Sequence, residues 1–174
     1  MKIAIADSCF LINWARFHQR NDILKVFNKI VIPEIILDEL EDVEVRRMIA
    51  KWVIKDVIII APRLLSLNSL TMKIVSLSES IPFIPRVDPP EAYCMCLAMK
   101  RGYIILTDNK AVKRIKEIIE EFKQIIVMNS LDVLMSLYRK NKRLLVKKIL
   151  RFMRETGIVF PKSRLRELGL EFNI

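Results

Sequence analysis

Four acidic side chains occupy positions from which they could bind one divalent metal ion together. Asp7 directly follows a short apolar run, and Asp108 follows another, the run from Tyr103 to Thr107. Glu91 falls in the first turn of a predicted helix, and Glu39 falls two turns into a predicted helix that follows a third apolar run. In open parallel α/β sheets the functional crevice lies at the carboxyl ends of the strands. We therefore expect the four carboxylates to meet at one edge of a sheet.

Carboxylates that lie close together repel one another, and a divalent cation resolves that conflict. Mg²⁺ prefers oxygen ligands and keeps several waters, and such an ion can activate water and stabilise charge on a phosphoryl group. Each acid taken alone could equally be a helix cap or a solvated surface group. Only their correlated placement favours a metal, which would be Mg²⁺ or Mn²⁺.

Other ligand types are scarce. His18 is the only histidine, which excludes histidine-rich zinc sites and His-dependent catalytic triads. Cys94 and Cys96 are two residues apart on a predicted helix and would point in different directions. Cys9 is expected to pack as a small apolar group. Any metal chemistry would then depend on oxygen ligands.

Short apolar runs alternate with helical patterns along the chain. Strands are expected at residues 2–6, 29–32, 57–60, 103–106 and 124–128. Helices are expected at residues 8–15, 21–27, 33–40, 43–52, 64–80, 92–100, 110–122, from 131 onward, and at 144–153. Asp88 and Ser130 are candidate helix caps, and Gly102 and Gly157 are candidate helix ends. This alternation predicts βαβ units and a parallel sheet within a compact α/β domain.

The positive charge is concentrated near the C-terminus. The chain of 174 residues carries a net charge of +10. Residues 139–166 contain eleven Lys or Arg and one acid, which nets +10, whereas the rest contains nineteen residues of each sign. Such a block suits nucleic acid, but it could also be a solvated helical face or a surface that docks on an acidic protein. We expect a domain at residues 1–138 and a basic helical extension at 139–174, packed on the same domain.

Three segments, taken in order and spacing, resemble the motifs of PIN-domain nucleases. The first is IADSCFLINWAR (Ile5 to Arg16), in which an Asp ends the first strand and an apolar helix follows. The second is IPEIILDEL (Ile32 to Leu40), in which the acid falls on Glu39. The third is EAYCMCLAMKRGYIILTDN (Glu91 to Asn109), in which an acid starts a helix and a strand then runs into Thr and a further acid. The resemblance covers residues 1–129, and RETGIVFPKSRL (Arg154 to Leu165) is similar to the extension of a prokaryotic subgroup.

The resemblance implies a three-layer α/β/α sandwich with a mainly parallel central sheet and a basic C-terminal helical extension. It also implies a metal-dependent ribonuclease, often the toxin of a toxin–antitoxin pair. A metal-bound water would attack a phosphodiester of RNA, with one or two Mg²⁺ or Mn²⁺ ions held by Asp7, Glu39, Glu91 and Asp108. The resemblance also implies two protein partners. They are an antitoxin and a second copy of the chain, with which it would form a homodimer.

The sequence departs from the family pattern at the fourth acid. In much of the family this acid lies two residues after the Thr, where this chain has Asn109, whereas Asp108 is one residue early. Either Asp108 turns inward, or the site uses three carboxylates with Asn109 as a polar neighbour. Ser8 could bond a metal-bound water or a carboxylate, or it could cap the first helix.

Basic side chains on two helices could bind nucleic acid, although helix surfaces often carry such residues. The candidates are Lys110, Lys113, Arg114, Arg143, Lys147 and Arg151. A chain that had lost catalysis would still bind RNA through them, and a protein-interaction module would use the basic tail on an acidic partner. The sequence has no signal-peptide pattern and no apolar run long enough for a membrane span, so we expect a cytoplasmic protein without a membrane partner.

Overall fold

A parallel five-stranded sheet forms the centre of the protein, which a computed structural model describes over residues 2–82 and 85–169. The strands are β1 (Ile3–Ala6), β2 (Lys29–Pro33), β3 (Ile58–Ala61), β4 (Ile104–Leu106) and β5 (Val127–Met128). Their order is β3-β2-β1-β4-β5, and every neighbouring pair is parallel. β1 is therefore the central strand, and its last three residues are fully buried. A strand covered on both faces needs such a continuous apolar run.

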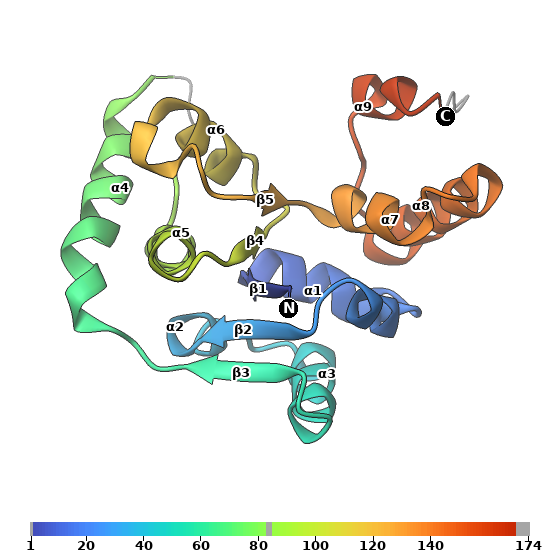
Figure 1. Cartoon of the computed structure of the whole chain (residues 1–174), viewed down its shortest axis with the longest axis horizontal. Helices are drawn as coiled ribbons and strands as arrows, with labels where there is room; N and C mark the ends of the chain where they lie inside the picture. The colour runs from blue at the N-terminus through green and yellow to red at the C-terminus, as the bar shows by residue number, and fades with distance from the viewer. Residues whose placement is uncertain (1, 83–84, 170–174) are drawn as a thin grey trace.

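Helices cover both faces of the sheet. They are α1 (Ser8–Arg16), α2 (Glu34–Leu37), α3 (Val43–Ile54), α4 (Asn68–Ser80), α5 (Pro89–Arg101), α6 (Lys110–Ile118), α7 (Ser130–Tyr138), α8 (Lys142–Thr156) and α9 (Lys162–Glu167). Figure 1 shows α4, α5 and α6 on one side of the central strands and α1, α7 and α8 on the other. The expected three-layer α/β/α sandwich with a C-terminal helical extension is confirmed.

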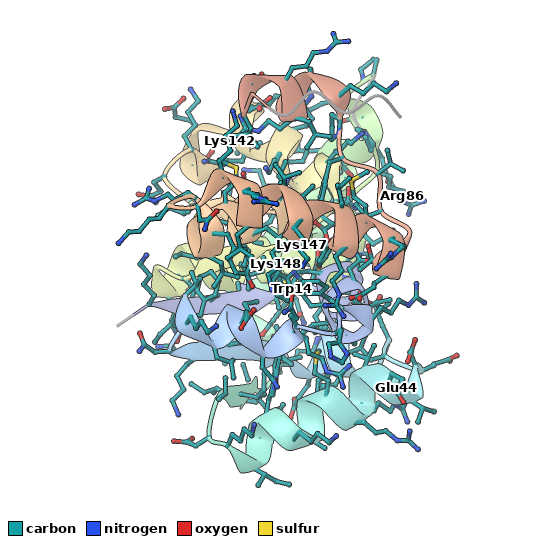
Figure 2. All side chains as sticks on the ribbon, turned by 90° about the vertical axis from the view of Figure 1, so that its right-hand side faces the viewer. Trp14, Glu44, Arg86, Lys142, Lys147 and Lys148 are labelled. Carbon is teal, nitrogen blue, oxygen red and sulfur yellow. The ribbon has the colours of Figure 1, made fainter. Side chains whose placement is uncertain are left out.

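An aromatic cluster joins α8 to the sandwich. Trp14 of α1 is fully buried and lies 5.6 Å, between ring centroids, from both Phe17 and Phe152. Phe152 in turn lies 6.0 Å from Phe160, in the connection to α9. Figure 2 shows α8 next to α1, with Lys147 and Lys148 labelled on α8 and Trp14 labelled between the two helices. The apolar face of α8 is thus part of the core, and the division of the chain at residue 138 stays a prediction.

Several elements differ from the predicted ones near their ends. The helix expected after β2 is the single turn α2, and Glu39 lies beyond it rather than two turns inside it. The helix expected at 21–27 is a 3₁₀ helix at Arg20–Lys25, and the helices expected at 64–80 and 110–122 include 3₁₀ turns at Leu65–Leu67 and Glu120–Phe122. The cap of α7 is Asn129, whose side chain accepts from the Asp132 N–H, so the prediction of a Ser130 cap is wrong. The predicted helix ends at Gly102 and Gly157 are confirmed, both with φ in the left-handed region (67° and 77°).

No helix within residues 2–82 and 85–169 is both long enough and apolar enough to cross a bilayer.

Candidate metal centre

Asp7 stands at the end of the central strand and caps the helix that follows. Its backbone N–H donates to the Leu106 carbonyl (3.1 Å), which continues the pairing of β1 with β4. Its Oδ1 accepts from the Phe10 N–H (2.8 Å) and from the Cys9 Sγ (3.2 Å). The side chain is 1% exposed, and its Oδ2 has no hydrogen-bond partner among the described residues. A buried carboxylate oxygen without a donor is rare, because its desolvation is then uncompensated.

Burial dominates the electrostatics of Asp7. The loss of solvent raises the pKa of its carboxyl from 3.8 to about 7. The nearby Thr107 hydroxyl, the Phe10 N–H and the Cys9 thiol lower this pKa, and the negative charge of Glu91 adds to the rise. A cation beside Oδ2 would reverse this balance and keep Asp7 ionised.

Glu91 approaches the same point from the first turn of α5. Its carboxylate accepts two hydrogen bonds from the Asn109 Nδ2, at 2.7 and 2.8 Å, and a longer one from the Asp88 N–H, at 3.4 Å. Partial burial raises the pKa of Glu91, and the bonds from Asn109 and Asp88 lower it. The negative charges of Asp88 and Glu39 add to the rise. Asn109 therefore fixes the direction of the Glu91 carboxylate.

The structure brings Asp7, Glu91 and Cys9 together. One possible ligand atom from each lies within 4.8 Å of the others. Cys9 was expected to pack as an apolar group, but it is only partly buried and its thiol donates to Asp7. A cysteine two residues after the strand-end Asp, in the first turn of the next helix, was the signal that could have identified it.

Asp108 points away from this group. Its Oδ2 accepts from the Asn13 Nδ2 (2.9 Å) and the Ser130 Oγ (2.7 Å), and its Oδ1 accepts from the Ser130 N–H (2.8 Å). The Ser130 Oγ itself accepts from the Trp14 Nε1 (3.1 Å), which leaves its proton for Asp108. Asn109, and not Asp108, is therefore the residue of this turn that contacts Glu91, while metal binding by Asp108 stays a prediction.

Glu39 and Ser8 lie at the margin of the group. Glu39 is exposed, and burial raises its pKa, with the Ser8 hydroxyl lowering it and the charge of Asp88 raising it further. Ser8 is the first residue of α1 and Asp7 is its cap, so the interpretation of Ser8 as a cap is wrong. The Ser8 hydroxyl lies close enough to Glu39 to lower the pKa of that carboxyl, and its bonding to a carboxylate or a metal-bound water stays a prediction.

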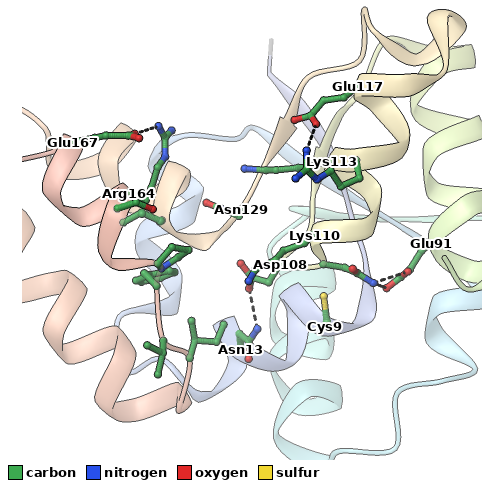
Figure 3. A pocket seen from close by; sticks show the side chains of 18 residues that line it. Cys9, Asn13, Glu91, Asp108, Lys110, Lys113, Glu117, Asn129, Arg164 and Glu167 are labelled. Carbon is green, nitrogen blue, oxygen red and sulfur yellow. Dashed lines mark hydrogen bonds and ion pairs between the residues drawn. The ribbon is translucent and has the colours of Figure 1, made fainter. Parts of the chain in front are cut away.

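A groove of about 990 Å³ leads away from the acidic group. Its charged lining has four acids and four bases, namely Glu91, Asp108, Glu117, Glu167, Lys110, Lys113, Arg114 and Arg164. Figure 3 shows lining side chains around the opening, with Cys9 and Glu91 at one end and Arg164 and Glu167 of α9 on the far wall. Lys113 is paired with Asp132 (3.0 Å) and Arg114 with Glu117 (3.0 Å), whereas Lys110 has no ion pair among the described residues. The groove alone therefore presents little surplus positive charge.

The basic residues expected on α8 lie elsewhere. Arg143, Lys147 and Arg151 do not line the groove. Lys147 and Arg151 line a separate hollow of about 380 Å³ with Leu150 and Arg154, and Arg151 is paired with Glu155 (2.6 Å). Their binding of nucleic acid stays a prediction, and it would involve a surface different from that of Lys110.

The donor set suits a divalent cation. Asp7 and Glu91 carry charges of the same sign at short distance, and the Asp7 Oδ2 has no hydrogen-bond partner in the part of the chain that the structure describes. A divalent ion supplies both the missing partner and the compensating charge.

The family assignment follows from comparison with known proteins. A family model described as a PIN domain matches residues 3–171, nearly the whole chain. No match was found among curated proteins. The parallel sheet, with acidic side chains gathered where β1 and β4 end, agrees with that match. The chain belongs to the PIN-domain family.

Proposed function

We propose that the protein is a ribonuclease that hydrolyses RNA phosphodiester bonds with Mg²⁺ or Mn²⁺ held by Asp7 and Glu91. PIN domains are generally nucleases that use divalent metals. The observation that carries the proposal is the buried Asp7, whose carboxylate lies within 4.8 Å of a Glu91 oxygen and whose Oδ2 has no hydrogen-bond partner among the residues described. When bound, the ion would supply positive charge at the phosphoryl group and an acidified water.

The chain's own residues would bind and orient the substrate. Asn109 holds the Glu91 carboxylate through two hydrogen bonds, which fix its orientation beside Asp7 and Cys9. Lys110 lines the groove, and its ammonium group, which has no ion pair within residues 2–82 and 85–169, is suited to a phosphate. Glu39, which is exposed, would support a water on the solvent side of the centre. Toxin activity, an antitoxin and a homodimer remain further predictions of the same proposal.

The test compares wild type, Asp7→Asn and Asp56→Asn on a mixed structured RNA with Mg²⁺, with Mn²⁺ and with EDTA. Asp56 is a matched control, because it is exposed, lies outside the groove and has a positive φ (54°) that Asn also adopts readily. We expect cleavage by wild type and Asp56→Asn with metal, and none by Asp7→Asn or with EDTA. Equal cleavage by wild type and Asp7→Asn would refute the proposal.

A second candidate is an RNA-binding module without catalysis. It is favoured by the direction of Asp108, which leaves Asp7 and Glu91 as the two carboxylates of the group. Under this alternative neither protein cleaves RNA, and salt-dependent RNA binding is the same for wild type and Asp7→Asn.

A further inference from the structure

We propose that Cys9 supplies a sulfur ligand to the metal centre, so that the centre binds a thiophilic divalent ion of the zinc class in preference to Mg²⁺. The inference rests on the proposed metal site for its two carboxylates. Its test needs no nuclease activity, so the two proposals can fail separately.

The geometry brings the sulfur within reach of a shared ion. The Cys9 Sγ and one carboxylate oxygen each from Asp7 and Glu91 lie within 4.8 Å of one another. Zinc–sulfur and zinc–oxygen bonds are about 2.3 and 2.1 Å long, so two ligands of one ion lie no more than about 4.4 Å apart. Small side-chain movements would therefore bring the three atoms into one coordination shell.

A second observation points to a missing ligand at this place. The Asp7 Oδ2 is buried and has no hydrogen-bond partner within the described part of the chain, while Oδ1 is occupied by the Phe10 N–H and the Cys9 Sγ. An ion bound to Oδ2 would lie close to the sulfur. On binding, the thiol proton that Cys9 donates to Asp7 would leave to solvent, and a lone pair of the resulting thiolate would bind the ion.

Cys9 is also the cysteine that the groove exposes. It is partly buried and lines the groove, whereas Cys94 and Cys96 are buried in α5 and do not line it. Figure 3 shows the Cys9 sulfur directed toward the side where Glu91 and Asn109 are bonded. An ion entering along the groove therefore meets the sulfur and the Glu91 carboxylate together.

Sulfur changes which ions the centre prefers. Mg²⁺ requires oxygen ligands in near-octahedral geometry, and a thiolate offers it little. Zn²⁺, Co²⁺ and Cd²⁺ accept thiolate and carboxylate together. A centre with one sulfur and two carboxylates should therefore hold these ions more tightly than Mg²⁺.

The experiment titrates the chelator-treated, reduced full chain with Co²⁺ and records the sulfur-to-cobalt charge-transfer band in the near ultraviolet. We expect the band in wild type and in Cys96→Ser, a buried thiol outside the groove, and its loss in Cys9→Ser. Cys9→Ser should weaken Co²⁺ and Cd²⁺ binding at least about tenfold, since even indirect ligand partners have effects of that size. Mg²⁺ affinity should be the same in wild type and Cys9→Ser.

A second measurement needs no substitution. Zn²⁺ should slow alkylation of Cys9 in the wild-type chain, as read by mass spectrometry of the modified peptide, and equal Mg²⁺ should not. The proposal is overturned if Co²⁺ binds without the band, if the band survives Cys9→Ser, or if Zn²⁺ gives no protection. RNA cleavage without the band would reject the sulfur ligand alone, and the band without cleavage would reject the nuclease alone.

Discussion

Asp7→Asn should change how the stability of the metal-free protein depends on pH. Burial raises the pKa of Asp7 from 3.8 to about 7, so the folded state takes up a proton that the unfolded state has already lost. This carboxyl has no effect on stability below the unfolded pKa, and its destabilising effect grows as pH rises toward the folded pKa. Raising the pKa of one carboxyl by about three lowers the free energy of unfolding by about 4 kcal/mol at neutral pH and above.

Asparagine removes this dependence but has a cost of its own. Its Oδ1 can still accept from the Phe10 N–H, whereas its amide nitrogen would replace the unpartnered Oδ2 as a buried donor without an acceptor. That cost is about 1–3 kcal/mol and does not vary with pH. The informative quantity is therefore the difference in the free energy of unfolding between the variant and wild type, followed as a function of pH. Between about pH 5 and about pH 8 this difference should shift by about 2–3 kcal/mol in favour of the variant.

Urea denaturation of both proteins in EDTA, across that pH range, measures this change. Mg²⁺ or Mn²⁺ at the upper pH should restore stability to wild type and leave Asp7→Asn unaffected, because binding to the folded state alone is stabilising. If the difference in free energy of unfolding between the two proteins stays constant with pH, the pKa of the buried Asp7 is not raised and the reasoning is refuted.

Three further perturbations have defined outcomes. Asn109→Asp keeps the cap of α6, where the side chain accepts from the Ala111 N–H (2.8 Å), and adds a carboxylate beside Glu91. Calorimetry should show Mn²⁺ affinity raised about tenfold. Phe152→Ala removes a fully buried ring from the aromatic cluster and should lower the free energy of unfolding by about 3–5 kcal/mol in chemical denaturation. Lys110→Ala should weaken RNA binding and reduce the slope of log affinity against log salt by about 1.

The controls follow from the same contacts. Asn109→Ala loses both the cap and the bonds to Glu91, so it should weaken Mn²⁺ binding, and equal affinity in all three proteins would contradict the place given to Asn109. Leu150→Ala, on the exposed side of α8, should have much less effect on unfolding than Phe152→Ala. An unchanged salt slope in Lys110→Ala would show that RNA does not follow the groove.

Local patterns predicted the strand ends well. Asp7 could be placed because an apolar strand ends just before it, and Glu91 because Asp88 and two prolines begin its helix. The direction of neighbouring side chains could not be read in this way. Asp108 and Asn109 are adjacent, and Asp108 is turned aside by Asn13 and Ser130, which are 95 and 22 residues away in the chain. Contacts of this separation carry no local signal, and the same is true of the approach of Cys9 to Glu91.

Residues from the N-terminal and C-terminal parts of the sequence line the same groove, and this has a consequence during synthesis. Cys9 lies at one end of the groove, while Ile158, Phe160 and Arg164 lie on its far wall. Translation proceeds from the N-terminus, so the ribosome completes that wall only after the acidic side chains and all five strands have been made. A nascent chain can carry every carboxylate of the centre and still lack one side of its groove.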